Sequence, residues 1–129
     1  MTKQEIINET VKYYDEDIDR RAMDIHGCIY NAYDGTYCAV GRCFEDKWKR
    51  VDDDFVLEGN DADIESMYKE NGFDNLDEML KPEYRGHKIE FWEELQRLHD
   101  NGSNWNSQGI STIGQANVDK LLKDYLEEK

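Results

Sequence analysis

The sequence predicts an α+β fold, a mainly helical single domain with one small antiparallel β-hairpin. Apolar residues recur at helical spacing near both ends and around residues 87–99, which indicates several helices. One stretch that begins near residue 28 instead has the short β-type runs of strands. The 129 residues contain no internal repeat and one proline, and a chain of this length suits one domain with its own core. The expected domain is therefore 1–129.

The first expected helix runs from residue 3 to about residue 15. Thr2 and Glu5 have the spacing of a capping box, in which each side chain accepts a hydrogen bond from the other residue's backbone N–H. The apolar residues that follow at helical spacing are Ile7, Val11, Tyr14 and Ile18. This spacing predicts one buried helix face.

Residues 28–44 are expected to form the hairpin. The β-type runs at 28–30 and 37–40 would be its strands, and Asp34 with Gly35 gives a strong turn signal between them. Gly41 would end the second strand or mark a bulge.

The second half of the chain predicts further helices. Asp61 is expected to cap a helix over 63–71, and a short helix is expected over 75–80, before Pro82. The apolar stripe over 87–99 predicts the clearest helix. The last helix should begin at Ser111, with Gly114 as an internal cost to its stability.

The charge of the chain is strongly negative and unevenly distributed. The formal net charge is −14, and residues 52–100 hold sixteen acidic and five basic residues. Such a surface repels phosphate backbones, so direct binding to nucleic acid or to anionic membranes is disfavoured and a protein partner with a basic surface is favoured. The alternative is that the charge only keeps the protein soluble. The acidic residues expected at an interaction surface are Asp52, Asp53, Asp54, Glu58, Asp61 and Asp63.

The termini and the cysteine count bear on the cellular compartment. No apolar run is as long as a membrane span, and the first ten residues have no hydrophobic signal core. Three cysteines is an odd number, which favours free thiols or metal ligands in a reducing compartment. A location in the cytoplasm is therefore expected.

Three cysteines near the expected hairpin form a candidate site. Folding of the hairpin would bring Cys28 close to Cys38, with Cys43 just beyond. Three thiolates with His26 or His99 would supply the four ligands of a tetrahedral zinc site, although the spacing is not that of a zinc ribbon. The alternative is that the cysteines are small buried hydrophobes.

A second interpretation makes one cysteine a nucleophile. Arg42 would favour the thiolate, and His99 with Asp100 would supply a base and an acid. The alternative is a core or helix-terminal histidine. Arg20 and Arg21 offer planar forks to an anionic ligand, or pair with nearby acids.

Several of these segments carry a resemblance. They are RR at 20–21, GCIY at 27–30, DG at 34–35, CAVGRC at 38–43, LEG at 57–59 and LQRLHD at 95–100, with Trp105. Together they look like a family of small uncharacterised proteins of bacteriophages and prophages, over residues 17–105. The resemblance implies an origin in a phage or prophage, with a location in the host bacterial cell. It also associates the cysteines of the hairpin with the end of the helix that carries His99 and Asp100.

Two hypotheses of different classes follow. The first is a phage accessory protein, such as a host-defence inhibitor or a nucleic-acid mimic, that modulates a host protein through its acidic surface. The second is a small metal-binding or thiol-dependent protein, whose cofactor is unknown, with zinc as the candidate. Whether the chain catalyses a reaction is left open by its sequence, which contains no common nucleotide-binding or hydrolase motif.

Overall fold

The computed structural model describes residues 1–20, 23–24, 27–28, 37–48 and 63–125, with 23–24 and 27–28 described by their backbone pairing alone. In these residues the fold is mainly helical with short antiparallel strand pairs, which confirms the predicted α+β class. None of the helices described there is long and apolar enough to cross a membrane.

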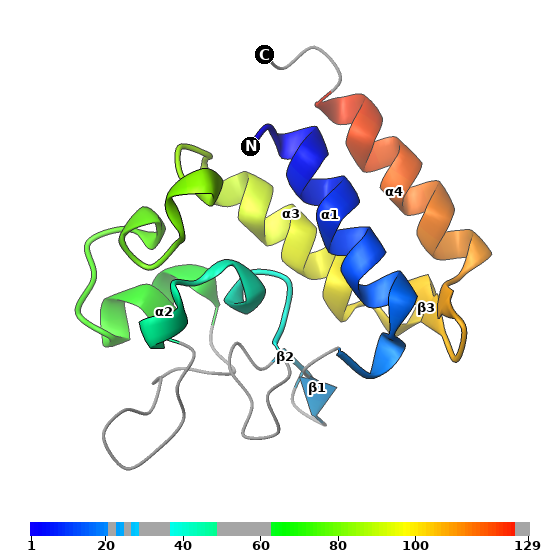
Figure 1. Ribbon diagram of the computed structural model, residues 1–129, viewed down its shortest axis with the longest axis horizontal. Helices are drawn as coiled ribbons and strands as arrows, with labels where there is room; N and C mark the ends of the chain where they lie inside the picture. Colours follow the sequence, from blue (N-terminus) through cyan, green and yellow to red (C-terminus); the bar gives the residue numbers. More distant parts are fainter. Residues whose placement is uncertain (21–22, 25–26, 29–36, 49–62, 126–129) are drawn as a thin grey trace.

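Four α-helices form the frame of the molecule (Figure 1). Their bounds are α1 (Lys3–Glu16), α2 (Ile64–Glu70), α3 (Ile89–Asp100) and α4 (Thr112–Asp124). Helix α4 packs against both α1 and α3, while α2 lies on the other side of the molecule among several single turns of 3₁₀ helix. The largest fully buried side chains between these elements are Trp92, Tyr14, Phe44, Phe91, Ile6, Ile7, Met67, Met79, Leu80 and Leu95.

Helix α1 begins as its sequence predicts. The hydroxyl of Thr2 accepts a hydrogen bond from the Glu5 N–H at 3.1 Å, and the Glu5 carboxylate accepts one from the Thr2 N–H at 2.9 Å. This capping box satisfies two backbone donors that a helix start leaves open. The helix ends at Glu16, and Ile18 falls in the 3₁₀ turn η1 (Ile18–Arg20).

The predicted second strand over 37–40 is wrong at 38–40, which form no strand, while Tyr37 is in a single β-bridge. Among the described residues, β2 (Gly27–Cys28) pairs with β1 (Met23–Asp24), in the register Met23 to Cys28. Residues 39–40 form a turn that leads into the 3₁₀ helix η2 (Gly41–Cys43), closed by the bond from the Arg42 N–H to the Cys38 carbonyl at 2.9 Å. A short apolar run has the same pattern in a strand and in a buried turn, so periodicity does not separate them. The expected first strand beyond residue 28 and the turn at 31–35 lie outside the described residues.

A second strand pair, which the sequence did not predict, lies between α3 and α4. β3 (Trp105–Asn106) pairs with β4 (Gly109–Ile110). Each strand has two residues, too few for a periodic signal. The pair is fixed to α1 because the Asp15 carboxylate accepts a hydrogen bond from the Ile110 N–H at 2.9 Å.

The helices predicted for the second half are found with two changes. Helix α2 is capped by Asp63, whose carboxylate accepts from the Ser66 N–H at 2.7 Å, and not by Asp61, which lies outside the described residues. The expected helix over 75–80 is only a 3₁₀ turn, η4 (Leu76–Glu78), followed by η5 (Pro82–Tyr84). Helices α3 and α4 are as predicted, and Ser111 caps α4 by accepting from the Gly114 N–H at 2.9 Å.

Candidate functional site

The turn over 38–43 and the second half of α3 meet at Gln96. Its side-chain oxygen accepts a hydrogen bond from the Val40 N–H at 3.1 Å, and its Nε2 donates to the Asp100 carboxylate at 3.0 Å. The same carboxylate oxygen lies 2.8 Å from Nδ1 of His99. Two segments that the sequence singled out therefore lie in contact, and a buried carboxamide, not a sulfur, makes the direct link. Sequence reasoning missed Gln96, because its role depends on the Val40 N–H, which is distant in the sequence and adjacent only in the fold.

His99 lies in aromatic packing inside the molecule. Its side chain is 1% exposed, and its ring packs edge-on against Tyr14 with 4.9 Å between centroids. The Tyr14 hydroxyl donates to the Tyr37 carbonyl at 2.6 Å, and the Trp105 indole donates to the His99 carbonyl at 3.1 Å. Burial, together with the nearby Cys38, raises the pKa of Tyr14 well above its ordinary value. This environment is that of a core histidine in a packed polar network.

The two cysteines whose side chains are described are free thiols inside the core. Cys38 and Cys43 are both 0% exposed. The Cys38 sulfur accepts from the Gly41 N–H at 3.4 Å, and the Cys43 thiol donates to the Ala39 carbonyl at 3.6 Å. Both sulfurs thus hold the turn together as small buried groups.

The described side chains do not assemble a metal site. Among them, no group of three or more His, Cys, Asp or Glu residues is arranged to hold a metal ion. The side chain of Cys28, with His26, lies outside the described residues, so a zinc site that includes them stays a prediction.

Arg42, which was expected to favour a cysteine thiolate, closes a cluster with Glu9, Thr10 and Tyr84. Its guanidinium donates to the Glu9 carboxylate at 2.7 Å and to the Thr10 hydroxyl at 2.9 Å, and it lies 5.4 Å from the Tyr13 ring centroid. The Tyr84 hydroxyl donates to the same Glu9 carboxylate. The Arg42 side chain is only 10% exposed. The cluster ties α1 to η2 and η5, a structural task that no sequence spacing indicated.

The charges in this cluster support one another. Burial alone raises the pKa of Glu9, but the hydrogen bonds from Tyr84 and Arg42 outweigh it and leave that pKa below its ordinary value. Burial alone lowers the pKa of Arg42, and nearby Cys43 with the Glu9 carboxylate more than reverses this. Burial and the bond to Glu9 raise the pKa of Tyr84. Arg42 and Glu9 are therefore a charged pair, with Tyr84 a neutral donor.

Of the predicted acidic surface, only Asp63 is described, and it is the cap of α2. Arg21 and the acidic residues between 52 and 61 lie outside the described residues. Arg20 pairs with Glu16 at 3.6 Å and donates to the Tyr13 carbonyl, so it serves α1.

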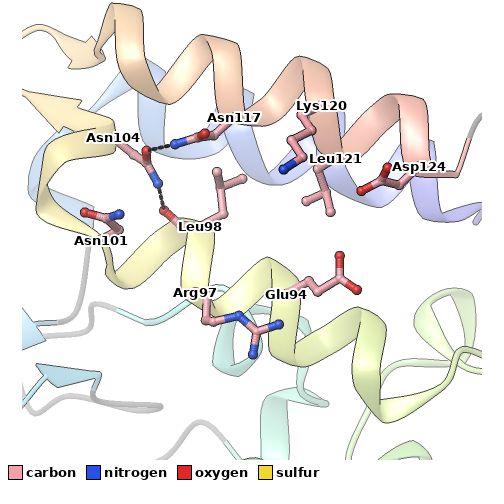
Figure 2. A pocket seen from close by; sticks show the side chains of 9 residues that line it. All are labelled: Glu94, Arg97, Leu98, Asn101, Asn104, Asn117, Lys120, Leu121 and Asp124. Atoms are coloured by element: carbon pink, nitrogen blue, oxygen red, sulfur yellow. Dashed lines mark hydrogen bonds between the residues drawn. The ribbon is translucent and has the colours of Figure 1, made fainter.

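A surface groove lies between α3 and α4 (Figure 2). Its volume is about 330 Å³. It is lined by Glu94, Arg97, Leu98, Asn101, Asn104, Asn117, Lys120, Leu121 and Asp124. Sequence reasoning missed this groove, since it depends on which two helices pack together. The apolar stripe of a helix shows which face is buried, but not which other helix covers that face.

No family model, no curated protein and no solved structure matches this chain.

Proposed function

We propose that the protein is a phage or prophage accessory protein that binds a host protein through its acidic exterior, on a basic surface of the kind that holds nucleic acid. The observation that carries the proposal is an excess of exposed carboxylates on residues 63–100. This stretch has eleven acidic and five basic residues. The phage origin comes from the sequence resemblance alone.

The exposed carboxylates of this stretch are largely free of cations. Among the described residues, Lys69 pairs with Glu65, while Lys81 and Arg85 pair with acids outside the stretch. This leaves a set of carboxylates that are exposed and in no ion pair within the described part of the chain. Apart from Asp63, which caps α2, they are Glu70, Asp74, Glu78, Glu83 and Glu90, here called the acidic set.

Uncompensated carboxylates on a surface favour a partner of opposite charge. They steer the encounter with a basic surface and exclude acidic competitors, more than they add to the final affinity. A groove that binds a nucleic-acid backbone carries many Lys and Arg side chains, which replace the counterions of the phosphates, and surface carboxylates pair with the same cations. Binding should therefore be specific and should weaken steeply as salt rises.

The test is capture from host lysate by the immobilised protein at low and at moderate salt. The variant Glu70→Gln/Asp74→Asn/Glu78→Gln removes three charges of the acidic set. We expect it to lose the captured protein and to flatten the salt dependence of what remains.

The matched control removes the same charge elsewhere, at the end of α1, as Glu16→Gln/Asp17→Asn/Asp19→Asn. This variant should keep the partner. Capture of no protein at either salt concentration would contradict the proposal, and so would equal losses in the two variants, since the partner would then sense only total charge.

A further inference from the structure

Two asparagine–glycine pairs occur in the chain, Asn71–Gly72 and Asn101–Gly102. Such a pair can modify itself, because the backbone nitrogen of the glycine can attack the side-chain carbonyl carbon of the asparagine. Glycine has no Cβ to hinder the closing of the ring. The attack requires a backbone nitrogen that is free to turn toward that carbon and open space around it. The fold gives the two pairs different conditions.

Asn71–Gly72 is held at the end of α2. The Gly72 N–H donates to the Lys69 carbonyl at 3.0 Å, so the attacking nitrogen is engaged in closing the helix. Nδ2 of Asn71 donates to the Met67 carbonyl at 2.8 Å, so the amide group that would leave is held as well. Attack requires both hydrogen bonds to open, and the fold therefore protects this pair.

Asn101–Gly102 lies in the turn that follows α3, at the edge of the groove between α3 and α4 (Figure 2). Both residues of the pair are exposed. Within the described residues, the Gly102 N–H donates no hydrogen bond, and a Cβ at Gly102 would meet nothing within 4 Å. The nitrogen thus has no hydrogen bond to break, and the ring has room to form.

The Asn101 side chain is folded back over the 3₁₀ turn η6 (Gly102–Asn104). Its Oδ1 accepts from the Ser103 N–H at 3.0 Å and from the Ser103 hydroxyl at 2.7 Å. Negative charge develops on this oxygen as the glycine nitrogen adds to the carbon beside it, and donors already placed on such an oxygen stabilise that charge. The two hydrogen bonds that cap η6 therefore also favour the attack.

We propose that Asn101 is a site of spontaneous deamidation, whose carboxamide becomes a carboxylate in the folded protein while that of Asn71 is retained. The Gly102 nitrogen loses its proton and bonds to Cγ of Asn101, and the side-chain nitrogen leaves as ammonia, which closes a succinimide ring. One water molecule then opens the ring at either carbonyl and gives aspartate or isoaspartate. Water is the co-reactant, and no atom is oxidised or reduced.

The products change the end of α3 and the groove. Either product adds one negative charge at a position that lines the groove. Aspartate keeps a side-chain oxygen for Ser103, but its charge lies beside the last carbonyls of α3, where the helix dipole is also negative. Isoaspartate in addition lengthens the backbone between positions 101 and 102 by one carbon. This inference goes beyond the proposed function and does not depend on it.

The test is peptide mapping by mass spectrometry after incubation of the folded protein in mildly alkaline ¹⁸O-labelled water. Digestion follows in ordinary water at acidic pH, so that the ¹⁸O label marks only conversion that took place in the folded protein. We expect Asn101 to convert about tenfold faster than Asn71, the ratio expected when hydrogen bonds must open before one of the two attacks. The variant Asn101→Asp supplies the reference peptide for the aspartate product.

Two controls connect the difference in rate to the fold. In concentrated urea the two rates should become similar, because the hydrogen bonds that protect Asn71 are then lost. Gly102→Ala has space for its Cβ and should stay folded, but this Cβ hinders ring closure and should slow conversion at Asn101 about tenfold, with Asn71 unchanged. Equal rates at the two pairs in the folded protein, or faster conversion at Asn71, would overturn the proposal. Conversion of Asn101 in urea alone would overturn it as well.

Discussion

At the residue scale, the contact between 38–43 and α3 depends on one carboxamide. Gln96 is 7% exposed and is the acceptor for the buried Val40 N–H. We expect Gln96→Ala to lower the free energy of unfolding by about 2 kcal/mol, because it leaves a buried donor unsatisfied. Urea unfolding measures this loss. The control Gln115→Ala removes an exposed glutamine whose side chain donates to the exposed Asp119, and it should cost no more than about 0.5 kcal/mol. Equal losses in both variants would contradict this role of Gln96.

Glu9 gives a prediction that depends on pH. Its pKa is lowered in the folded protein, so the stabilisation it provides is present above its unfolded pKa and is lost as the pH falls through its folded pKa. Glu9→Gln should lower the free energy of unfolding at neutral pH by about 1 kcal/mol, a discounted value because the Glu9 side chain is 39% exposed. The difference from the unmutated protein should shrink as the pH is lowered below the ordinary range of glutamate.

The measurement is urea unfolding at neutral and at acidic pH. Glu90→Gln is the control, since Glu90 is exposed and in no ion pair among the described residues. It should change stability little at either pH. A loss in Glu9→Gln that is the same at both pH values would contradict the charged pair with Arg42.

At the element scale, Gly114 shows how packing reverses a local propensity. A glycine inside a helix normally costs about 1 kcal/mol relative to alanine. Here a Cβ at position 114 would lie 2.1 Å from the Asn104 carbonyl oxygen and 2.8 Å from a side-chain carbon of Ile110. Gly114→Ala should therefore destabilise the protein, by about 2 kcal/mol or more. Gly102→Ala is the control, because a Cβ there meets nothing within 4 Å. A rise in the thermal midpoint of Gly114→Ala would contradict the close approach of α4 to Asn104.

Local signals predicted some elements and not others, for physical reasons. The start of α1 depends on two side chains three residues apart, and the stripe of α3 on five residues of one helix, so both were predictable. The turn over 38–43 was not, because its hydrogen bonds go to its own backbone and to two residues distant in the sequence, Gln96 and Lys81. The sequence shows that Gly114 weakens a helix, but it does not show that the backbone of Asn104 leaves no room for a larger residue at this position.

The candidate site was predictable only in part. The sequence singled out 38–43 and 95–100, which do meet, but it placed the chemistry on sulfur and imidazole. A buried cysteine and a metal-ligating cysteine look the same in a sequence, and only the fold distinguishes them. The groove between α3 and α4 requires the pairing of two helices, which no single stripe specifies.

At the scale of the whole molecule, charge and shape have separate tasks. The core fixes the helices, and the carboxylates of the acidic set are exposed and in no ion pair within the described part of the chain. The groove between α3 and α4 differs, since Arg97 and Lys120 line it and are in no ion pair with a described residue.

The most direct test of the acidic exterior is competition with nucleic acid for the captured host protein. Labelled double-stranded DNA is bound to that host protein, and its fluorescence anisotropy is followed as the acidic protein is added. We expect the anisotropy to fall to that of free DNA, with more protein needed for the Glu70→Gln/Asp74→Asn/Glu78→Gln variant. DNA that stays bound while the protein binds the same host molecule would contradict the account.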